Sequence, residues 1–269
     1  MDKTLVTFEE QGEIGVITLV NPGKRNVLSR AALGQLIERL EEVEAAAKVK
    51  CVILRSEGPV FSAGHDLTEI IEGSDLERES LFALCTQAMQ MVRSLSLPVI
   101  AEVQGLATAA GCQLAATCDL VVAAEDASFA TPGIKIGLFC STPAVALSRA
   151  VMPKKAMEML LTADPITARE AERIGLVNRV VPRAELSDAT MKLARQIASA
   201  SPFTIGLGKR AFYEQLELEV PLAYQVTERA MIENAKSPDA IEGMKAFLER
   251  RVPRWSTAES SRNAPKPKK

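Results

Sequence analysis

The sequence predicts an α/β protein, because strand-like and helix-like segments alternate along most of the chain and only helices follow. The alternation runs to about residue 182, and every segment from Leu186 onward has helical character. Strands that are followed by helices pair in parallel through right-handed crossovers. We therefore expect a parallel sheet covered by helices, with a purely helical C-terminal part.

Apolar patterning locates the expected strands. In the segment 6–20, side chains that would face opposite sides of a strand alternate, and a turn is expected near Gln11. This pattern predicts a hairpin. Three continuous apolar runs are typical of strands covered on both faces and lie at residues 51–54, 99–103 and 120–123. A further short strand is expected just before Pro182.

Capping residues and helical spacing locate the helices. Ser29 is expected to cap a helix that runs to about residue 48, and apolar residues recur at helical spacing over 81–95. The polar, acidic segment 69–80 predicts a mobile loop. Caps mark later helix starts at Thr142-Pro143 and Thr167, and a further helix is expected at 155–161. Breaks between the C-terminal helices are expected at Ser201-Pro202, near Val220-Pro221 and at Ser237-Pro238.

The composition excludes several classes of protein. The chain has 269 residues, a net charge of −2 and no sustained basic face, which indicates a globular protein without a nucleic-acid partner. The first residues contain no apolar signal core, and no run approaches the length of a membrane span. We therefore expect no membrane association and a cytoplasmic location.

Histidine and cysteine usage argues against a metal centre. His65 is the only histidine, which excludes sites that need two, including most zinc sites. The five cysteines follow no metal-like spacing and lie mostly in apolar settings, so we expect buried free thiols in a reducing compartment. No metal is therefore predicted.

Three loops rich in small residues are expected to form one site, at residues 61–67, 105–113 and 131–142. Each follows a strand-like run, and ligands of open α/β folds bind outside the carboxyl ends of the strands. The second loop joins a buried strand to the first turn of a helix that contains Gln113. Such a turn presents backbone N–H groups that can bind negative charge.

These loops also carry a family resemblance. The segments FSAGHDL, GLATAAGCQLAATCD and SFATPGIKIGLFCSTPA, followed by LLTADPITAREAERIGLVNRVVP, are similar to the enoyl-CoA hydratase/isomerase (crotonase) superfamily. The resemblance continues in order to EGMKAFLERR near the C-terminus, and it is strongest to the enoyl-CoA hydratase domain-containing 3 proteins.

The resemblance implies a crotonase-like spiral of ββα units with a C-terminal helical trimerisation region. It divides the chain into a spiral core at 1–200, an oligomerisation region at 201–255 and a tail at 256–269, whose polar, proline-bearing composition predicts disorder. The implied partners are an acyl-CoA substrate of fatty acid metabolism and further copies of the chain, as a homotrimer or dimer of trimers. Coenzyme A would be part of the substrate, and no separate cofactor is expected.

In this superfamily two backbone N–H groups form an oxyanion hole for the thioester carbonyl. By position in the motifs, the resemblance assigns these donors to Ala63 and Ala110. Phe247 and Arg250 match positions that reach the CoA of a neighbouring subunit. The full set of positions that the resemblance assigns to CoA binding is Lys24, Arg25, Val27, Ala63, His65, Asp66, Leu67, Ala109, Gly111, Phe247 and Arg250.

The sequence departs from the family where hydratases carry two catalytic glutamates. Gln113 stands in the G-C-E-L turn, and Gly133 stands after the proline of the Q-P-E loop. Loss of one general acid or base typically costs about 10²–10⁴-fold in rate. Glutamine cannot act as a general base at neutral pH, so hydration by the usual mechanism is in doubt.

Three functions stay open at this point. The first is hydratase-like chemistry through the oxyanion hole. The second is decarboxylation of a malonyl-type acyl-CoA using His65, because the similar FSAGHD segment of methylmalonyl-CoA decarboxylase uses its histidine. The third is a non-catalytic acyl-CoA-binding module. As catalytic groups, Cys140 and the loop residues Glu69 and Glu72 are weaker alternatives.

Overall fold

Two sheets form the body of the molecule. The structure is a computed structural model that describes residues 3–256. The larger sheet has the order β1-β2-β3-β5-β7-β10, with strands Val6–Gln11, Ile14–Leu19, Cys51–Ser56, Val99–Val103, Leu120–Ala124 and Arg179–Val181. The smaller sheet has the order β4-β6-β8-β9, with strands Val60–Ser62, Leu106–Thr108, Ser128–Ala130 and Ile166–Thr167.

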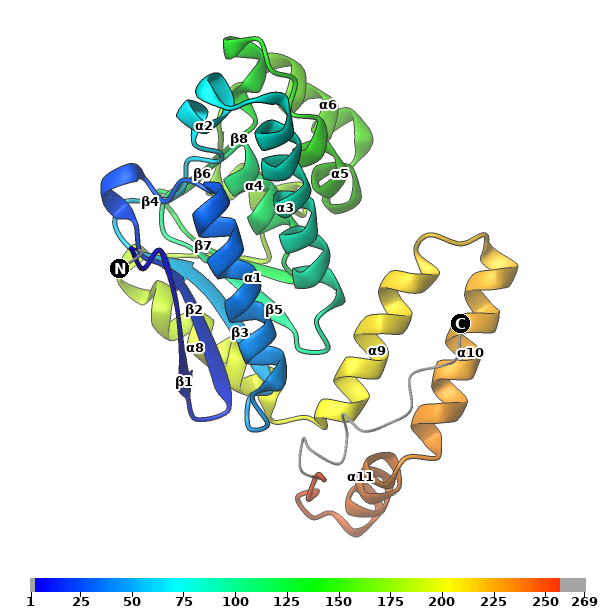
Figure 1. The fold of residues 1–269 in the computed structure, drawn as a ribbon. Helices are drawn as coiled ribbons and strands as arrows, with labels where there is room; N and C mark the ends of the chain where they lie inside the picture. Colours follow the sequence, from blue (N-terminus) through cyan, green and yellow to red (C-terminus); the bar gives the residue numbers. More distant parts are fainter. Residues whose placement is uncertain (1–2, 257–269) are drawn as a thin grey trace.

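The larger sheet confirms the predicted strands. Its first two strands form the expected antiparallel hairpin, with Gln11 opposite Ile14, and the others run parallel to their neighbours. Every residue of β2 and β5 is buried, as expected for strands covered on both faces. Figure 1 shows α1 and α3 in front of this sheet and α8 behind it.

The strands of the smaller sheet are too short and too rich in small residues to be predicted from the sequence. Three of its strands, β4, β6 and β8, have three residues each and run parallel. Their carboxyl ends therefore lie next to one another at one edge of the sheet. The three small-residue loops begin at these ends, so the expectation that they meet is confirmed by the strand order.

Helices follow the strands and then form the whole C-terminal part. Ser29 caps α1 as predicted, because its side chain accepts a hydrogen bond from the N–H of Ala32 at 3.2 Å. The helices of the first part are Arg30–Ala45 (α1), Leu67–Glu72 (α2), Asp75–Ser94 (α3), Ala110–Thr117 (α4), Ser141–Ala150 (α5), Pro153–Thr162 (α6), Ala168–Arg173 (α7) and Leu186–Ala198 (α8). The last three are Pro202–Gln215 (α9), Val220–Ala235 (α10) and Pro238–Glu249 (α11).

Two local predictions were wrong. The acidic segment 69–80 was expected to be a loop, but only Gly73 and Ser74 lie outside helices. Ser74 and Glu77 form a capping box that starts α3 six residues before Leu81. Helix α5 begins at Ser141, two residues before the start that a Thr142 cap predicts, and its N-cap residue Cys140 makes no side-chain capping bond.

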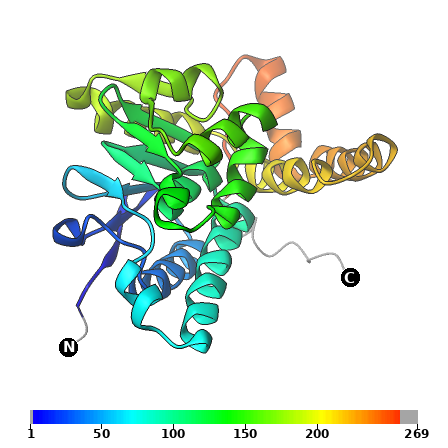
Figure 2. The same cartoon turned by 90° about the horizontal axis from the view of Figure 1, so that it is seen from above.

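The helices α9 to α11 form an arm that projects from the body (Figures 1 and 2). Ser201 and Ser237 cap α9 and α11, and a proline lies in the first turn of all three helices, as the sequence breaks predict. No helix among residues 3–256 is long and apolar enough to span a membrane. The tail predicted to be disordered, 256–269, lies outside the described residues except for Ser256.

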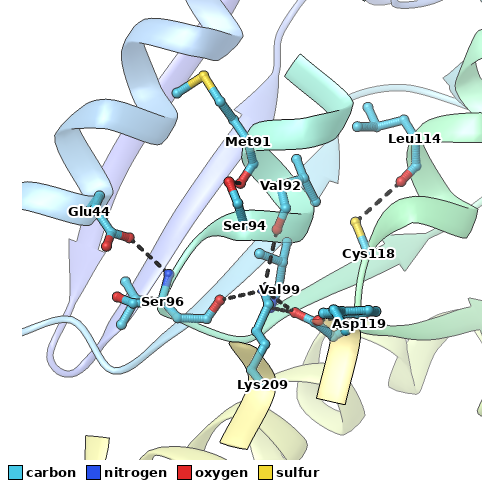
Figure 3. Close-up of polar contacts among 12 residues, drawn as sticks. Glu44, Met91, Val92, Ser94, Ser96, Val99, Leu114, Cys118, Asp119 and Lys209 are labelled. Carbon is cyan, nitrogen blue, oxygen red and sulfur yellow. Dashed lines mark hydrogen bonds and ion pairs between the residues drawn. The ribbon is translucent and has the colours of Figure 1, made fainter. Parts of the chain in front are cut away.

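A buried ion pair fastens the arm to the body (Figure 3). The side chain of Lys209 in α9 is 8% exposed, and its ammonium donates to Asp119 at 2.7 Å and to the carbonyls of Leu97 at 2.9 Å and Val92 at 3.3 Å. Asp119 also accepts the Tyr213 hydroxyl at 2.8 Å. All three ammonium hydrogens are therefore used by the body of the protein.

Candidate active site

The first two loops touch closely at the edge of the small sheet. Gly64 has a positive φ of 83°, and a Cβ built on it would lie 3.1 Å from the amide nitrogen of Ala110. A Cβ on Gly111 would lie 2.4 Å from the carbonyl oxygen of Ser62. A side chain at either Gly64 or Gly111 would push the two loops apart. Glycine at these positions therefore lets the two backbones lie in contact.

The structure corrects one of the two oxyanion donors assigned by resemblance. The N–H of Ala63 donates to the carbonyl of Arg25 at 3.0 Å, so it is not available to a ligand. The next N–H, of Gly64, donates to the Ser62 hydroxyl at 3.2 Å. Within the described chain, the first N–H of this loop without an acceptor is that of His65, and the N–H of Ala110 also has none.

A strained residue holds the second donor in place. Ala109 has φ 51° and ψ −120°, a conformation that L-residues rarely adopt, immediately before the first residue of α4. Such strain costs of order 1–3 kcal/mol and persists only where the surroundings enforce it. Here the N–H of Ala109 bonds the carbonyl of Ala130 on β8 at 3.0 Å, which ties the second loop to the third.

Each of the three loops contains a buried side-chain polar atom that has no hydrogen-bond partner. Among residues 3–256, the buried side-chain polar atoms without a hydrogen-bond partner are Arg39 Nε, His65 Nε2, Gln113 Oε1 and Thr131 Oγ1. His65, Gln113 and Thr131 come from the first, second and third loop respectively. An unsatisfied buried polar atom costs about 1–3 kcal/mol, so this clustering points to a ligand that supplies the missing partners.

His65 is held as a neutral ring. Its Nδ1 lies 3.2 Å from the carbonyl oxygen of Leu28, which can only accept, so Nδ1 carries the proton and Nε2 is left as an acceptor. Phe82 packs edge-on against the ring at 5.4 Å between centroids. Burial lowers the pKa of His65 below its ordinary 6.5, and the Leu28 contact and the Glu69 charge oppose this only partly.

We expect the titration of His65 to report this burial. As the one histidine of the chain, it gives a single imidazole signal by NMR, whose midpoint should lie below 6.5 because desolvation disfavours the charged ring. As the pH falls below 6.5, His65 is protonated in the unfolded chain before it is protonated in the folded one, and this favours unfolding. The contribution of the neutral His65 to the free energy of unfolding is therefore complete above pH 6.5 and is lost as the pH falls through the lowered pKa of the folded state. A His65→Asn variant should lose this part of the pH dependence. A midpoint at or above 6.5 would contradict the buried, neutral ring.

The two positions at which family hydratases carry glutamates differ in whether they have room for a side chain. Gln113 is 5% exposed in the first turn of α4, with its amide oxygen unpartnered. At Gly133 a Cβ would lie 2.1 Å from the carbonyl oxygen of Leu138 and 2.8 Å from the Cys140 sulfur. The third loop has closed over Gly133, since the N–H of Leu138 bonds its carbonyl at 2.9 Å. A glutamate there would require this loop to be rebuilt.

The weaker catalytic alternatives gain no support. Burial raises the pKa of the Cys140 thiol, which opposes thiolate formation. Glu69 accepts the backbone N–H of Arg30 at 2.9 Å, and Glu72 is exposed in α2. All five cysteines are free and buried, as predicted.

The positions expected to bind CoA fall into two groups. Lys24 and Asp66 pair at 3.2 Å, and the Leu28 N–H bonds the Gly64 carbonyl at 2.7 Å, so the segments 24–28 and 63–67 lie together. By contrast, Phe247 and Arg250 lie on or at the end of α11, at the opposite end of the molecule from α2 and α4 (Figure 1). Within one chain, these two residues do not reach the site.

A cavity lies between Gln113 and the arm. It has a volume of about 840 Å³ and lies among α3, α4, α5 and α9, with Gln113 in its lining. Pockets that bury small ligands typically measure about 300–1,000 Å³. Sequence inspection did not find this cavity, because residues from distant segments, such as Arg93, Arg149 and Lys209, form it. Thr131 was not singled out either, although it is the first residue of the third loop and carries a hydroxyl.

Comparison with known proteins decides the family. A family model described as Enoyl-CoA hydratase/isomerase matches residues 9–258. The chain belongs to the enoyl-CoA hydratase/isomerase family. It is 50% identical over 242 residues to the human protein named Enoyl-CoA hydratase domain-containing protein 3, mitochondrial, covering 89% of this chain and 80% of that one.

Solved structures of the enoyl-CoA hydratase/isomerase family confirm the crotonase fold. The crystal structure of human enoyl Coenzyme A hydratase domain-containing protein 3 matches with a TM-score of 0.91 at 47% identity, covering 94% of this chain and all of that one. An enoyl-CoA hydratase of Mycobacterium smegmatis matches with the same TM-score at 43% identity, covering 94% of this chain and 99% of that one. The predicted fold and the resemblance to domain-containing 3 proteins are both confirmed.

The same comparison overturns the expected location. The relatives from mouse, human and rat are all named as mitochondrial proteins, which points to mitochondria rather than the cytoplasm. The prediction rested on the absence of an apolar signal core. That absence concerns secretory signals and does not distinguish a mitochondrial family member from a cytoplasmic one.

Proposed function

We propose that this protein processes acyl-CoA thioesters by polarising the thioester carbonyl between two backbone N–H groups, those of His65 and Ala110. The observation that carries the proposal is that both N–H groups lack an acceptor at the place where two loops touch. Preorganised donors in a site shielded from water stabilise the negative oxygen of an enolate, and one such donor contributes about 3–4 kcal/mol.

Gln113 is the side chain best placed to act on the acyl group. It lies one turn after Ala110 on α4, and its buried amide oxygen has no partner. A neutral amide can orient a water molecule or the substrate by hydrogen bonds, but it cannot take a proton. We infer slow, hydratase-like or isomerase-like chemistry in fatty acid metabolism, in which the oxyanion hole does most of the work.

Hydration of crotonyl-CoA, followed by the loss of enoyl absorbance, tests this function. We expect slow turnover by the wild type, less by Gln113→Ala, and an increase of at least tenfold in Gln113→Glu, because a carboxylate supplies the missing general base. Wild-type turnover no higher than that of Gln113→Ala would rule out hydration. Binding of crotonyl-CoA without turnover by any variant would instead support a binding module.

A second function is favoured by one observation, the neutral His65 ring whose Nε2 is buried without a partner. Decarboxylation of a malonyl-type acyl-CoA forms an enolate, which needs an oxyanion hole but no base. In the neutral ring Nε2 can only accept a hydrogen bond, so His65 would act after taking up a proton there. Its Nε2–H would then donate to the departing carboxylate and pass that proton to the enolate carbon, which returns the ring to the neutral form. CO₂ release from malonyl-CoA should fall in His65→Asn, and an unchanged rate would remove the histidine from this reaction.

We also propose that the arm assembles homotrimers, singly or as dimers of trimers. The residues 201–255 expose large apolar side chains that a single chain leaves uncovered, among them Tyr224, Met231, Phe247 and Leu248, all at least 66% exposed. Exposed apolar surface of this kind marks protein–protein contacts. In such an assembly Phe247 and Arg250 of one chain would reach the CoA bound to a neighbouring subunit.

A further inference from the structure

The cavity beside Gln113 is lined in part by charged side chains, although an unsubstituted fatty acyl chain is entirely apolar. Neither of the proposed oxyanion donors, His65 and Ala110, lines it, but Gln113 does, three residues after Ala110 on α4. An acyl group whose carbonyl binds at Ala110 would enter this cavity by passing Gln113. Beyond apolar positions such as Met89 and Val145, the lining includes Arg93, Arg149 and Glu217.

The two arginines share a single carboxylate. Glu217 lies in the turn after α9 and accepts from Arg93 at 3.1 Å and from Arg149 at 3.2 and 3.4 Å. Arg93 also stacks over the Tyr213 ring, with its guanidinium carbon 4.5 Å from the centroid. The stacking fixes the plane of the Arg93 guanidinium without using its hydrogen-bond donors.

The other charges near this cluster do not balance it. Lys209 and Asp119 already neutralise each other, and the ammonium of Lys209 has no hydrogen left to donate. Arg210 and Glu214 also line the cavity and carry opposite charges, so together they add no net charge. Two guanidinium groups facing one carboxylate leave one positive charge uncompensated. A guanidinium binds a carboxylate with two parallel hydrogen bonds, which makes a second carboxylate the best-matched ligand.

We propose that the cavity selects acyl chains that end in a carboxylate, so that the substrates are CoA thioesters of dicarboxylic acids. The proposal rests on the acyl-CoA function proposed above. The thioester carbonyl binds at the oxyanion hole, the methylene chain passes Gln113, and the terminal carboxylate binds Arg93 and Arg149 beside Glu217. Because these arginine side chains are 30% and 45% exposed, water weakens the interaction, and the expected selectivity is about tenfold.

Binding of two saturated thioesters of equal carbon number tests the proposal in the full chain. Adipyl-CoA and hexanoyl-CoA differ only in the terminal group, and neither can be hydrated. Calorimetry should give about tenfold tighter binding of adipyl-CoA to the wild type. Arg149→Gln should reduce this ratio toward one without weakening hexanoyl-CoA, whereas Glu217→Gln should increase it, because the competing carboxylate is removed.

The control is Arg173→Gln, which removes an exposed arginine that pairs with Glu170 on α7, outside the cavity. It should leave the ratio unchanged. Equal affinities of the wild type for both thioesters, or an unchanged ratio in Arg149→Gln, would overturn the proposal while leaving the acyl-CoA function intact. If neither thioester binds, the acyl-CoA function fails with it.

Discussion

Gly64→Ala is expected to lower acyl-CoA turnover by about 10²–10³-fold, the effect of losing one oxyanion-hole donor. The added methyl would lie 3.1 Å from the amide nitrogen of Ala110 and 2.9 Å from the Ala109 Cβ. It therefore occupies space that the thioester oxygen needs to reach the Ala110 N–H. Steady-state kinetics on the substrate that the wild type turns over fastest measures the loss.

Gly12→Ala is the matched control for this variant. Gly12 also has a positive φ, 69°, but a Cβ there would have no neighbour within 4 Å. Both variants place alanine in the left-handed region at a cost of roughly 1–2 kcal/mol, and only Gly64→Ala adds a methyl at the site. Comparable turnover in the two variants would contradict an oxyanion hole beside Ala110.

Lys209→Met is expected to lower the free energy of unfolding by about 3–5 kcal/mol, because it leaves the carboxylate of Asp119 without its counter-ion in a largely buried place. Two backbone carbonyls, of Val92 and Leu97, lose their donor as well. Urea unfolding at a fixed protein concentration measures the change.

Lys135→Met provides the comparison for Lys209→Met. Lys135 lies 3.6 Å from Asp164 and donates to the Ala163 carbonyl at 3.1 Å, and both charged side chains are more than half exposed. Exposed pairs contribute about 0–1 kcal/mol, so this variant should unfold almost as the wild type does. Equal losses in the two variants would show that Lys209 does not anchor the arm.

Periodicity and caps were sufficient to predict the elements that bury apolar surface. The hairpin at 6–20, the covered strand at 99–103 and the Ser29 cap are all present. The three-residue strands β4, β6 and β8 are too short to show a period, so the second sheet was missed. The segment 69–80 was mispredicted because charge was taken as evidence against a helix, although its Ser74 and Glu77 are good capping residues.

The sequence predicted that the three loops meet and assigned Ala110 as one donor, but it assigned the wrong second donor. Small residues indicated where backbone would approach a ligand, and the three loops do meet. Whether a backbone N–H of these loops can bind a ligand depends, however, on its hydrogen bonds to residues that are distant in the sequence. The carbonyl of Arg25 uses the Ala63 N–H, and no local pattern shows that pairing. The cavity and the arginines that share Glu217 depend likewise on how α3, α5 and α9 pack together.

Infrared spectroscopy of a bound thioester tests the oxyanion hole most directly, since it requires no turnover. With a ¹³C-labelled thioester carbonyl in hexanoyl-CoA, binding to the wild type and to Gly12→Ala should shift the carbonyl stretch to lower frequency, because two N–H groups polarise the bond. In Gly64→Ala the shift should be smaller or absent. A bound carbonyl whose frequency in the wild type equals that of the free thioester in water would contradict the account.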